Sequence, residues 1–142
     1  MMVYVNGTDI ARLVLGGLEN STWVHPLEVL EVRPEQYLSC LETWLDKHGL
    51  SRRDIEGFVI VAGPGSATSL RTSHAMVNAL AFALNVKVAS INKLPEFSDA
   101  DILTLLPSHG EAGRGSHFAL PTYARDPKIT QTKRDALKRK VS

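Results

Sequence analysis

The stretch that decides the fold is built as a strand, a turn and a helix. It begins Gly57-Phe58-Val59-Ile60-Val61-Ala62-Gly63-Pro64-Gly65-Ser66. The run from Phe58 to Ala62 is apolar and mostly β-branched, which is typical of a strand buried on both faces of a sheet. The residues from Gly63 to Ser66 then break the pattern sharply. A helix is expected over Thr68–Asn85, followed by a short strand over Lys87–Ile91.

Three short β-rich runs and one amphipathic helix are expected before this stretch. The runs are Met2–Asn6, closed by a turn at Gly7–Asp9; Ala11–Leu15, ended by Gly16 and Gly17; and Thr22–Val32, with an interruption at Pro26. The short turns between them predict an antiparallel meander. Apolar residues recur on one helical face between Pro34 and His48, and Gly49 is placed to cap the end of that helix.

The order of these elements predicts the fold class. Three strands, a helix, a strand, a helix and a strand give an α/β fold with a mixed five-stranded sheet. The last strands are expected to be parallel because a helix joins them. We expect one lobe over residues 1–95 and a reduced C-terminal segment over residues 96–142. In that segment the signal weakens to a short helix over Asp99–Leu106 and a basic terminal helix over Lys133–Lys140.

Composition narrows the class of protein. The chain has 142 residues and a mass of 15.6 kDa, which fits one domain. Hydrophobic residues make up 44% and charged residues 22%, and this balance excludes wholesale disorder. Cys40 is the one cysteine, so no internal disulfide is expected, and we interpret it as a small buried hydrophobe. No leader and no long apolar run are present, so we expect a cytoplasmic protein without a membrane span.

Charge is distributed unevenly along the chain. Residues 125–142 hold seven Lys or Arg against two Asp, a net charge of +5, and the rest of the chain carries −4. The tail is therefore expected either to meet an anionic partner, such as RNA or an acidic protein face, or to be a solvated terminus. If tRNA is the partner, the expected contacts are Lys133, Arg134, Lys138, Arg139 and Lys140.

The helix expected over Thr68–Asn85 is apolar around most of its circumference. His74 and Asn78 are its only polar residues between positions 74 and 84, and with Arg71 they form one narrow stripe. Such a helix is either a central core helix or one with a face that a second chain covers. We favour the second interpretation, because few other elements are available to cover it. The expected interface residues are Tyr37, Leu38, Leu41, Trp44, Leu45, Arg71, Ala75, Asn78, Ala79 and Phe82.

Two of these residues raise separate questions. Trp44 suits a core position and an anchor at an interface equally well. Arg71 begins its helix, where a positive charge opposes the helix dipole. We therefore expect Arg71 to have an acidic or carbonyl partner, and a solvated side chain is the alternative.

The turn Gly63, Pro64, Gly65 and Ser66 lies between a strand and a helix, a place where backbone N–H groups can bind phosphate. The turn is neither a P-loop nor a complete dinucleotide-binding motif, and Pro64 lacks an N–H donor. We therefore favour Ser66 or Thr68 as a helix cap. The sequence contains no His-Glu-x-x-His and no Gly-x-Ser-x-Gly, so we expect no metal site and no catalytic residue.

The stretch from Ile55 to Arg71, with its continuation to Ile91, resembles the TsaB (YeaZ) family. Members carry Gly-Pro-Gly-Ser-Phe-Thr-Gly-Leu-Arg, followed by an alanine-rich helix and a short strand. Positions 63–66, 68, 70 and 71 agree with this motif, whereas Ala67, Ser69 and Ser73 depart from it. The segment Pro121–Pro127 also resembles the Pro-x-Tyr-x-Arg segment near the end of many members.

The resemblance implies a degenerate, non-catalytic, actin-like ATPase fold, of the ribonuclease H-like type, without a cofactor. It also implies a subunit of the machinery that makes threonylcarbamoyladenosine at position 37 of tRNA. Such a subunit binds a TsaD-type catalytic subunit through its first two helices, here Pro34–His48 and Thr68–Asn85. Homodimers through the same surface, a TsaE-type ATPase and indirect contact with tRNA are further implied partners.

Two departures from the family separate this chain from active relatives. The chain is too short for a second lobe, so it resembles a one-lobe version. Asn6 stands near the place of an Asp that organises metal and phosphate, and an amide cannot supply the anionic ligand that Mg²⁺ prefers. Two alternatives stay open: a small ATP-binding or phosphotransfer enzyme that uses the Gly63–Ser66 loop, and a self-associating scaffold outside this pathway.

Overall fold

The computed structural model describes residues 1–92, so the helices expected at Asp99–Leu106 and Lys133–Lys140 lie outside the described residues. Five strands, two α-helices and two short 3-10 helices make up the described part of the chain. They are β1 Met2–Asp9, β2 Arg12–Glu19, β3 Thr22–Leu30, η1 Pro34–Gln36, α1 Tyr37–Lys47, η2 Arg52–Asp54, β4 Gly57–Gly63, α2 Ala67–Leu84 and β5 Lys87–Asn92.

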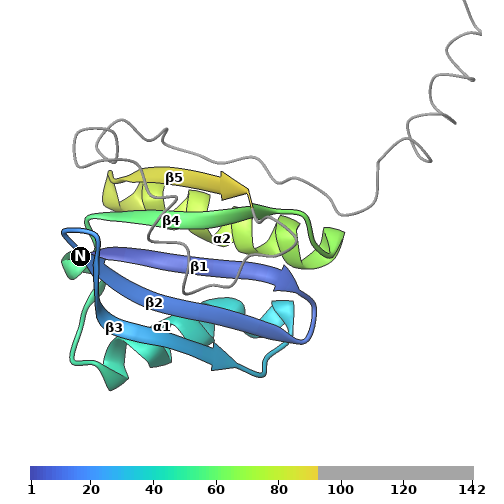
Figure 1. The fold of residues 1–142 in the computed structure, drawn as a ribbon, viewed down its shortest axis with the longest axis horizontal. Helices are drawn as coiled ribbons and strands as arrows, with labels where there is room; N and C mark the ends of the chain where they lie inside the picture. The colour runs from blue at the N-terminus through green and yellow to red at the C-terminus, as the bar shows by residue number, and fades with distance from the viewer. Residues whose placement is uncertain (93–142) are drawn as a thin grey trace, which may run out of the picture.

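The strands form one mixed sheet in the order β3-β2-β1-β4-β5. β1 and β3 each pair antiparallel with β2, whereas β4 pairs parallel with both β1 and β5. Parallel neighbours need a crossover, and α1 and α2 lie in the two crossovers, on the same face of the sheet (Figure 1). The mixed five-stranded α/β sheet that the sequence predicts is therefore confirmed.

The central strands β1, β2 and β4 are buried on both faces of the sheet, whereas the edge strand β3 is partly exposed. β4 is buried along its whole length, as its unbroken apolar run predicts. Side chains alternate between the faces along β1, so that Val3 and Val5 pack under the helices while Tyr4 faces the other side. On that second face the Tyr4 and Trp23 rings meet edge to face, with centroids 5.6 Å apart.

The second strand does not end before its two glycines, so that prediction is wrong. β2 continues through Gly16 and Gly17 to Glu19. A Cβ atom at Gly16 would lie 2.6 Å from the Trp23 ring, and one at Gly17 would lie 2.8 Å from the sulfur of Met1. The glycines are therefore needed for the close packing of large side chains against the strand, and not for a turn.

The first and third strands are also continuous where the sequence predicts breaks. β1 extends through Gly7 to Asp9, with an irregular register to β2 between Asn6 and Asp9. A Cβ atom at Gly7 would lie 2.6 Å from Cβ of Ser73, so this glycine lets β1 approach α2. β3 passes through Pro26 because it is an edge strand of the described sheet, where proline is tolerated.

The two helices begin and end close to the predicted residues. The turn at Pro34 is a 3-10 helix that leads into α1, and Gly49 caps α1 with a left-handed backbone at φ +68°. Ser66 caps α2, since its hydroxyl accepts a hydrogen bond from the amide of Ser69. Within residues 1–92, no helix combines the length and the apolar character that crossing a membrane requires.

Four of the five α1 residues assigned to a partner interface lie in the core of the protomer. Tyr37, Leu41, Trp44 and Leu45 are buried against the sheet and α2. The periodicity identified the apolar face of α1 correctly, but that face covers the protein's own sheet. These side chains are not available to a partner, and Leu38, which is 47% exposed, is the member of the set that remains on the surface of α1.

This correction can be tested with two leucines of the same helix. Leu41→Ala removes a side chain that is 1% exposed and leaves a cavity, so it should lower the free energy of unfolding by about 2–5 kcal/mol. Leu38→Ala should change it by less than about 1 kcal/mol, because that side chain is half in solvent. Urea unfolding followed by tryptophan fluorescence measures both, and equal losses would contradict the assignment.

Candidate functional site

α2 is held against the sheet by one side of its surface. Leu70, Val77, Leu80 and Ala81 are buried there, together with the polar residues Ser69, Ser73 and His74. At its end, Asn85 adopts a left-handed conformation and the amide of Val86 donates to the Ala81 carbonyl at 2.9 Å. With the Ser66 cap at its start, the helix is therefore fixed at both ends, and its buried side sets its orientation on the sheet.

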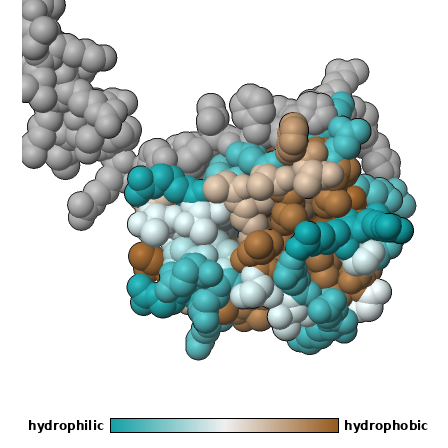
Figure 2. Space-filling model, turned by 180° about the vertical axis from the view of Figure 1, so that it is seen from behind, coloured by the Kyte–Doolittle hydropathy of each residue, from teal (hydrophilic) through white to brown (hydrophobic). Residues whose placement is uncertain are grey.

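The opposite side of α2 is exposed and largely apolar. It consists of Arg71, Ala75, Ala79, Phe82 and Ala83, which we call the α2 face. Phe82 is 86% exposed, the most exposed of the large hydrophobic residues in the described part of the chain. Figure 2, which views the helix side of the molecule, shows hydrophobic surface between hydrophilic areas. The expectation that the fold does not enclose the whole circumference of this helix is therefore confirmed.

The predicted polar stripe does not form one surface. Arg71 is exposed and its Nε donates to the Ala67 carbonyl at 3.4 Å, which supplies the carbonyl partner that the sequence predicts. His74 is 2% exposed, and its Nδ1 lies 2.7 Å from the Leu70 carbonyl oxygen. Because a carbonyl only accepts, Nδ1 carries the proton, and Nε2 is buried without a hydrogen-bond partner in residues 1–92.

Burial lowers the pKa of His74 below its ordinary value, because a charged imidazolium is poorly solvated inside the protein. The hydrogen bond to the Leu70 carbonyl raises the pKa, but by less. His74 is therefore a neutral core residue at neutral pH, and it cannot contribute charge to a partner surface.

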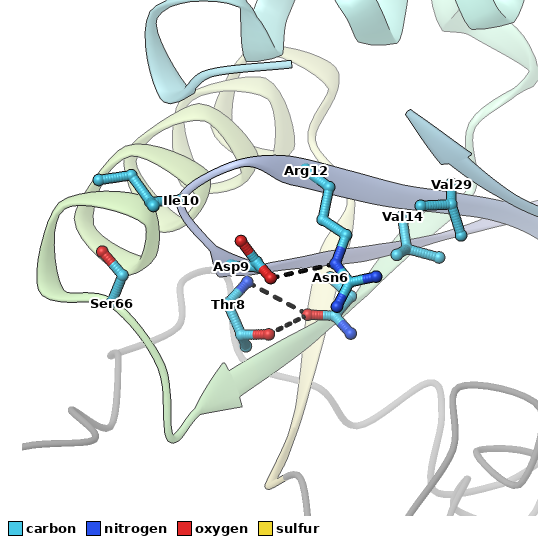
Figure 3. A pocket seen from close by; sticks show the side chains of 8 residues that line it. All are labelled: Asn6, Thr8, Asp9, Ile10, Arg12, Val14, Val29 and Ser66. Carbon is cyan, nitrogen blue, oxygen red and sulfur yellow. Dashed lines mark hydrogen bonds and ion pairs between the residues drawn. The ribbon is translucent and has the colours of Figure 1, made fainter. Parts of the chain in front are cut away.

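A pocket of about 420 Å³ lies at the end of β1, beside the first turn of α2. Its lining residues are Asn6, Thr8, Asp9, Ile10, Arg12, Val14, Val29 and Ser66 (Figure 3). One part of the wall is apolar, from Ile10, Val14 and Val29, and the rest is polar. In parallel α/β sheets, ligands bind beyond the carboxyl ends of the strands, and this pocket occupies such a position relative to β1.

The polar groups of the pocket bind one another. The Asn6 Oδ1 atom accepts from the Thr8 amide at 3.2 Å and from the Thr8 hydroxyl at 2.7 Å. The Asp9 carboxylate accepts from the Ala11 amide at 2.8 Å and from Arg12 Nε at 3.1 Å. Within residues 1–92, no three His, Cys, Asp or Glu side chains are grouped closely enough to hold a metal ion.

The hairpin at this pocket is joined to both helices. The Tyr37 hydroxyl of α1 donates to the Asp9 carbonyl at 3.2 Å, and the Ser66 amide at the start of α2 donates to the Thr8 carbonyl at 2.9 Å. Burial, and to a smaller extent the Asp9 charge, raises the pKa of Tyr37, so its hydroxyl stays protonated and keeps this donor role. The sequence analysis did not identify Thr8 or Tyr37 in these roles.

Cys40 is half-buried and lines a second hollow, of about 300 Å³, between β3 and α1. Burial raises the pKa of its thiol, and the Glu28 carboxylate adds to this effect. A thiol with a raised pKa forms little thiolate, which is the reactive species. The interpretation of Cys40 as a small hydrophobe therefore fits the structure better than that of a nucleophile.

Comparison with known families identifies the group to which this fold belongs. The model of the TsaD family, described as tRNA N6-adenosine threonylcarbamoyltransferase, matches residues 21–103, more than half of the chain. The chain belongs to the TsaD family. The match includes β3, α1, β4, the Gly63–Ser66 turn, α2 and β5, and it begins after β1 and β2. It therefore covers the helix that carries the α2 face.

Solved structures show the same fold. YeaZ from Pseudomonas aeruginosa is 21% identical, with a TM-score of 0.56 over 66% of this chain and 44% of that one. A second structure, an uncharacterized protein with similarity to peptidase YeaZ from the same organism, gives 21% and 0.55 over 66% and 43%. The chain therefore has the TsaB/YeaZ-type, actin-like fold that its motif resembles, and it spans less than half the length of these proteins.

The buried histidine predicts how stability depends on pH. Unfolding returns the pKa of His74 from its lowered value to about 6.5, so the unfolded state binds a proton first as the pH falls. The stability that neutral His74 contributes is fully present above pH 6.5 and is lost below it, by up to about 1.4 kcal/mol at pH 5.5. Urea unfolding between pH 7.5 and 5.5 measures this loss.

His74→Asn provides the comparison, because its amide can still donate to the Leu70 carbonyl but does not titrate. The difference in unfolding free energy between the unsubstituted protein and His74→Asn should shrink as the pH falls, because only His74 titrates. A difference that is the same at both pH values would contradict the role assigned to His74, whatever the other histidines contribute.

Proposed function

We propose that this protein is a non-catalytic subunit of the machinery that makes threonylcarbamoyladenosine at position 37 of tRNA. In this proposal residues 1–95 form the actin-like lobe, and the lobe binds and organises a TsaD-type catalytic subunit. Membership of the TsaD family supports the link to the pathway. The observation that carries the binding role is the α2 face, an exposed apolar helix surface on an otherwise well-packed lobe.

The composition of the α2 face suits another helix as its partner. Ala75, Ala79 and Ala83 have short side chains, which let a second helix approach closely. Phe82 stands out beside them and is placed to act as an anchor, the role that large aromatic side chains have at interfaces. Leu38 and Asn78 extend the proposed contact, and Arg71 offers a positive charge at its end.

The same face would serve a homodimer in the absence of the catalytic subunit. In the proposal the two states compete, because one surface cannot hold two helices at once. A self-associating scaffold outside the pathway would use the same face without binding a TsaD-type protein. Co-purification with such a protein distinguishes the two functions, and a TsaE-type ATPase would join only through the assembled complex.

The non-catalytic role is supported by the chemistry of the pocket. Asp9, the one carboxylate among its lining residues in the described part of the chain, is paired with Arg12. By the resemblance, Asn6 stands near the place of an Asp in active relatives. Neither residue is arranged as a general base or as a metal ligand. We propose that the protein contributes binding and organisation, and that its partner carries the chemistry.

Ala79→Glu tests the α2 face. A carboxylate placed in the centre of a helix contact loses its hydration without gaining a partner, so affinity for a TsaD-type protein should fall by at least about tenfold. The melting temperature should change little, because Ala79 is exposed. Calorimetry measures binding to the purified catalytic subunit, and light scattering measures the homodimer.

Ala11→Glu is the matched control, since Ala11 is an exposed alanine at the tip of the hairpin. It introduces the same charge away from the α2 face and should leave both affinities unchanged. If Ala79→Glu bound the catalytic subunit as tightly as Ala11→Glu does, the α2 face would not be the interface.

The basic residues 125–142 supply a separate proposal, that this segment contacts tRNA. Replacing Lys133, Arg134, Lys138, Arg139 and Lys140 with serine should weaken tRNA binding by the full complex. The slope of log affinity against log salt should also flatten, by roughly 0.7 to 0.9 for each lost phosphate contact. An unchanged slope would show that these five residues do not touch the tRNA.

A further inference from the structure

The actin-like ATPase fold implies a magnesium nucleotide near the pocket at the end of β1. The pocket can be tested for the two features that such a ligand needs. One is a set of backbone N–H groups open to a phosphate at the start of a helix. The other is a carboxylate free to bind Mg²⁺ directly or through water.

The backbone N–H groups at the start of α2 that could bind a phosphate are in contact with other groups of the same chain. The Ser66 amide donates to the Thr8 carbonyl at 2.9 Å, and the Ser69 amide points to the Ser66 hydroxyl at 3.5 Å. A Cβ atom at Gly65 would lie 2.5 Å from the Thr8 carbonyl oxygen. β1 and the turn are therefore in direct contact, and no phosphate fits between them.

The oxygen atoms that could bind Mg²⁺ are also engaged in hydrogen bonds within the chain. The Asn6 side-chain oxygen is bound by the Thr8 amide and hydroxyl, and the Asp9 carboxylate is bound by Arg12 and the Ala11 amide. Among the pocket-lining residues in the described part of the chain, Asp9 is the one carboxylate, and Arg12 forms an ion pair with it. The residues present do not fit a magnesium nucleotide.

We infer that the contact of Thr8 with Gly65 and Ser66 is an intramolecular latch that stands in the place of the nucleotide. The Thr8 carbonyl gives the start of α2 the acceptor that a phosphate would provide. The latch ties the β1–β2 hairpin to α2, and the Tyr37 hydroxyl ties the same hairpin to α1. The helices are thus held in one arrangement without a ligand, independently of which partner the α2 face binds.

Ligand binding to the chain of 142 residues tests the inference. Millimolar Mg·ATP, Mg·ADP and inorganic phosphate should each leave the melting temperature unchanged and give no binding heat in calorimetry, because a ligand stabilises only a state that it binds. A saturable rise in melting temperature with any of the three would overturn the latch. That result would leave binding at the α2 face unaffected, so the two proposals fail separately.

Amide hydrogen exchange tests the latch in the unmodified protein. The Ser66 amide should exchange at least tenfold more slowly than in an unstructured peptide, and exchange at the unstructured rate would refute the hydrogen bond to Thr8. Gly65→Ala should accelerate exchange at Ser66, since its Cβ displaces the Thr8 carbonyl, while the amide of Ile60 in β4 serves as the internal control. Slow exchange at Ser66 that Gly65→Ala leaves unchanged would also refute the latch.

Discussion

The close packing of α2 on the parallel pair β1 and β4 is the constraint on which the rest of this lobe depends. β4 is buried on both faces, so its hydrogen-bonded neighbours and the helix above it cannot shift without exposing apolar surface. Gly7 brings β1 within contact distance of Ser73, and the glycine is what makes that approach sterically possible. The packing of its buried side therefore sets the position of α2. That position in turn determines which residues of the helix face solvent.

The proposed function rests on the outer side of α2. α1 covers the sheet with Tyr37, Leu41, Trp44 and Leu45, and the Trp44 side chain is fully enclosed. α2 has more apolar surface than the sheet can take, which leaves Phe82 and three alanines in solvent. Membership of the TsaD family supports the proposed pathway, whereas the proposal of a binding role rests on this difference between the two helices.

The pocket at the end of β1 has polar groups that are engaged with one another. Its location is that of a ligand site in α/β proteins, but its polar atoms bind one another. Family membership alone does not reveal this, because it describes the fold and the common motif. The hydrogen bonds of Thr8, Asn6 and Asp9 engage the polar groups of this region, and the bond from the Ser66 amide to the Thr8 carbonyl connects the hairpin to α2.

The sequence alone determined the order of the elements, the mixed sheet, the cap at Gly49 and the excess apolar surface of α2, because these follow from local periodicity and local backbone geometry. It narrowed the cap of α2 to Ser66 or Thr68, and the structure selects Ser66. The tertiary structure decided which partner each residue meets. Gly16 and Gly17 look like a turn in sequence but serve the packing of Trp23 from β3 and of Met1 at the start of the chain. His74 looks like part of an exposed stripe but is buried, and Tyr37 looks like an interface residue but anchors the hairpin. A residue's type and spacing show that it needs burial or a hydrogen bond, whereas only the folded chain shows which distant group supplies it.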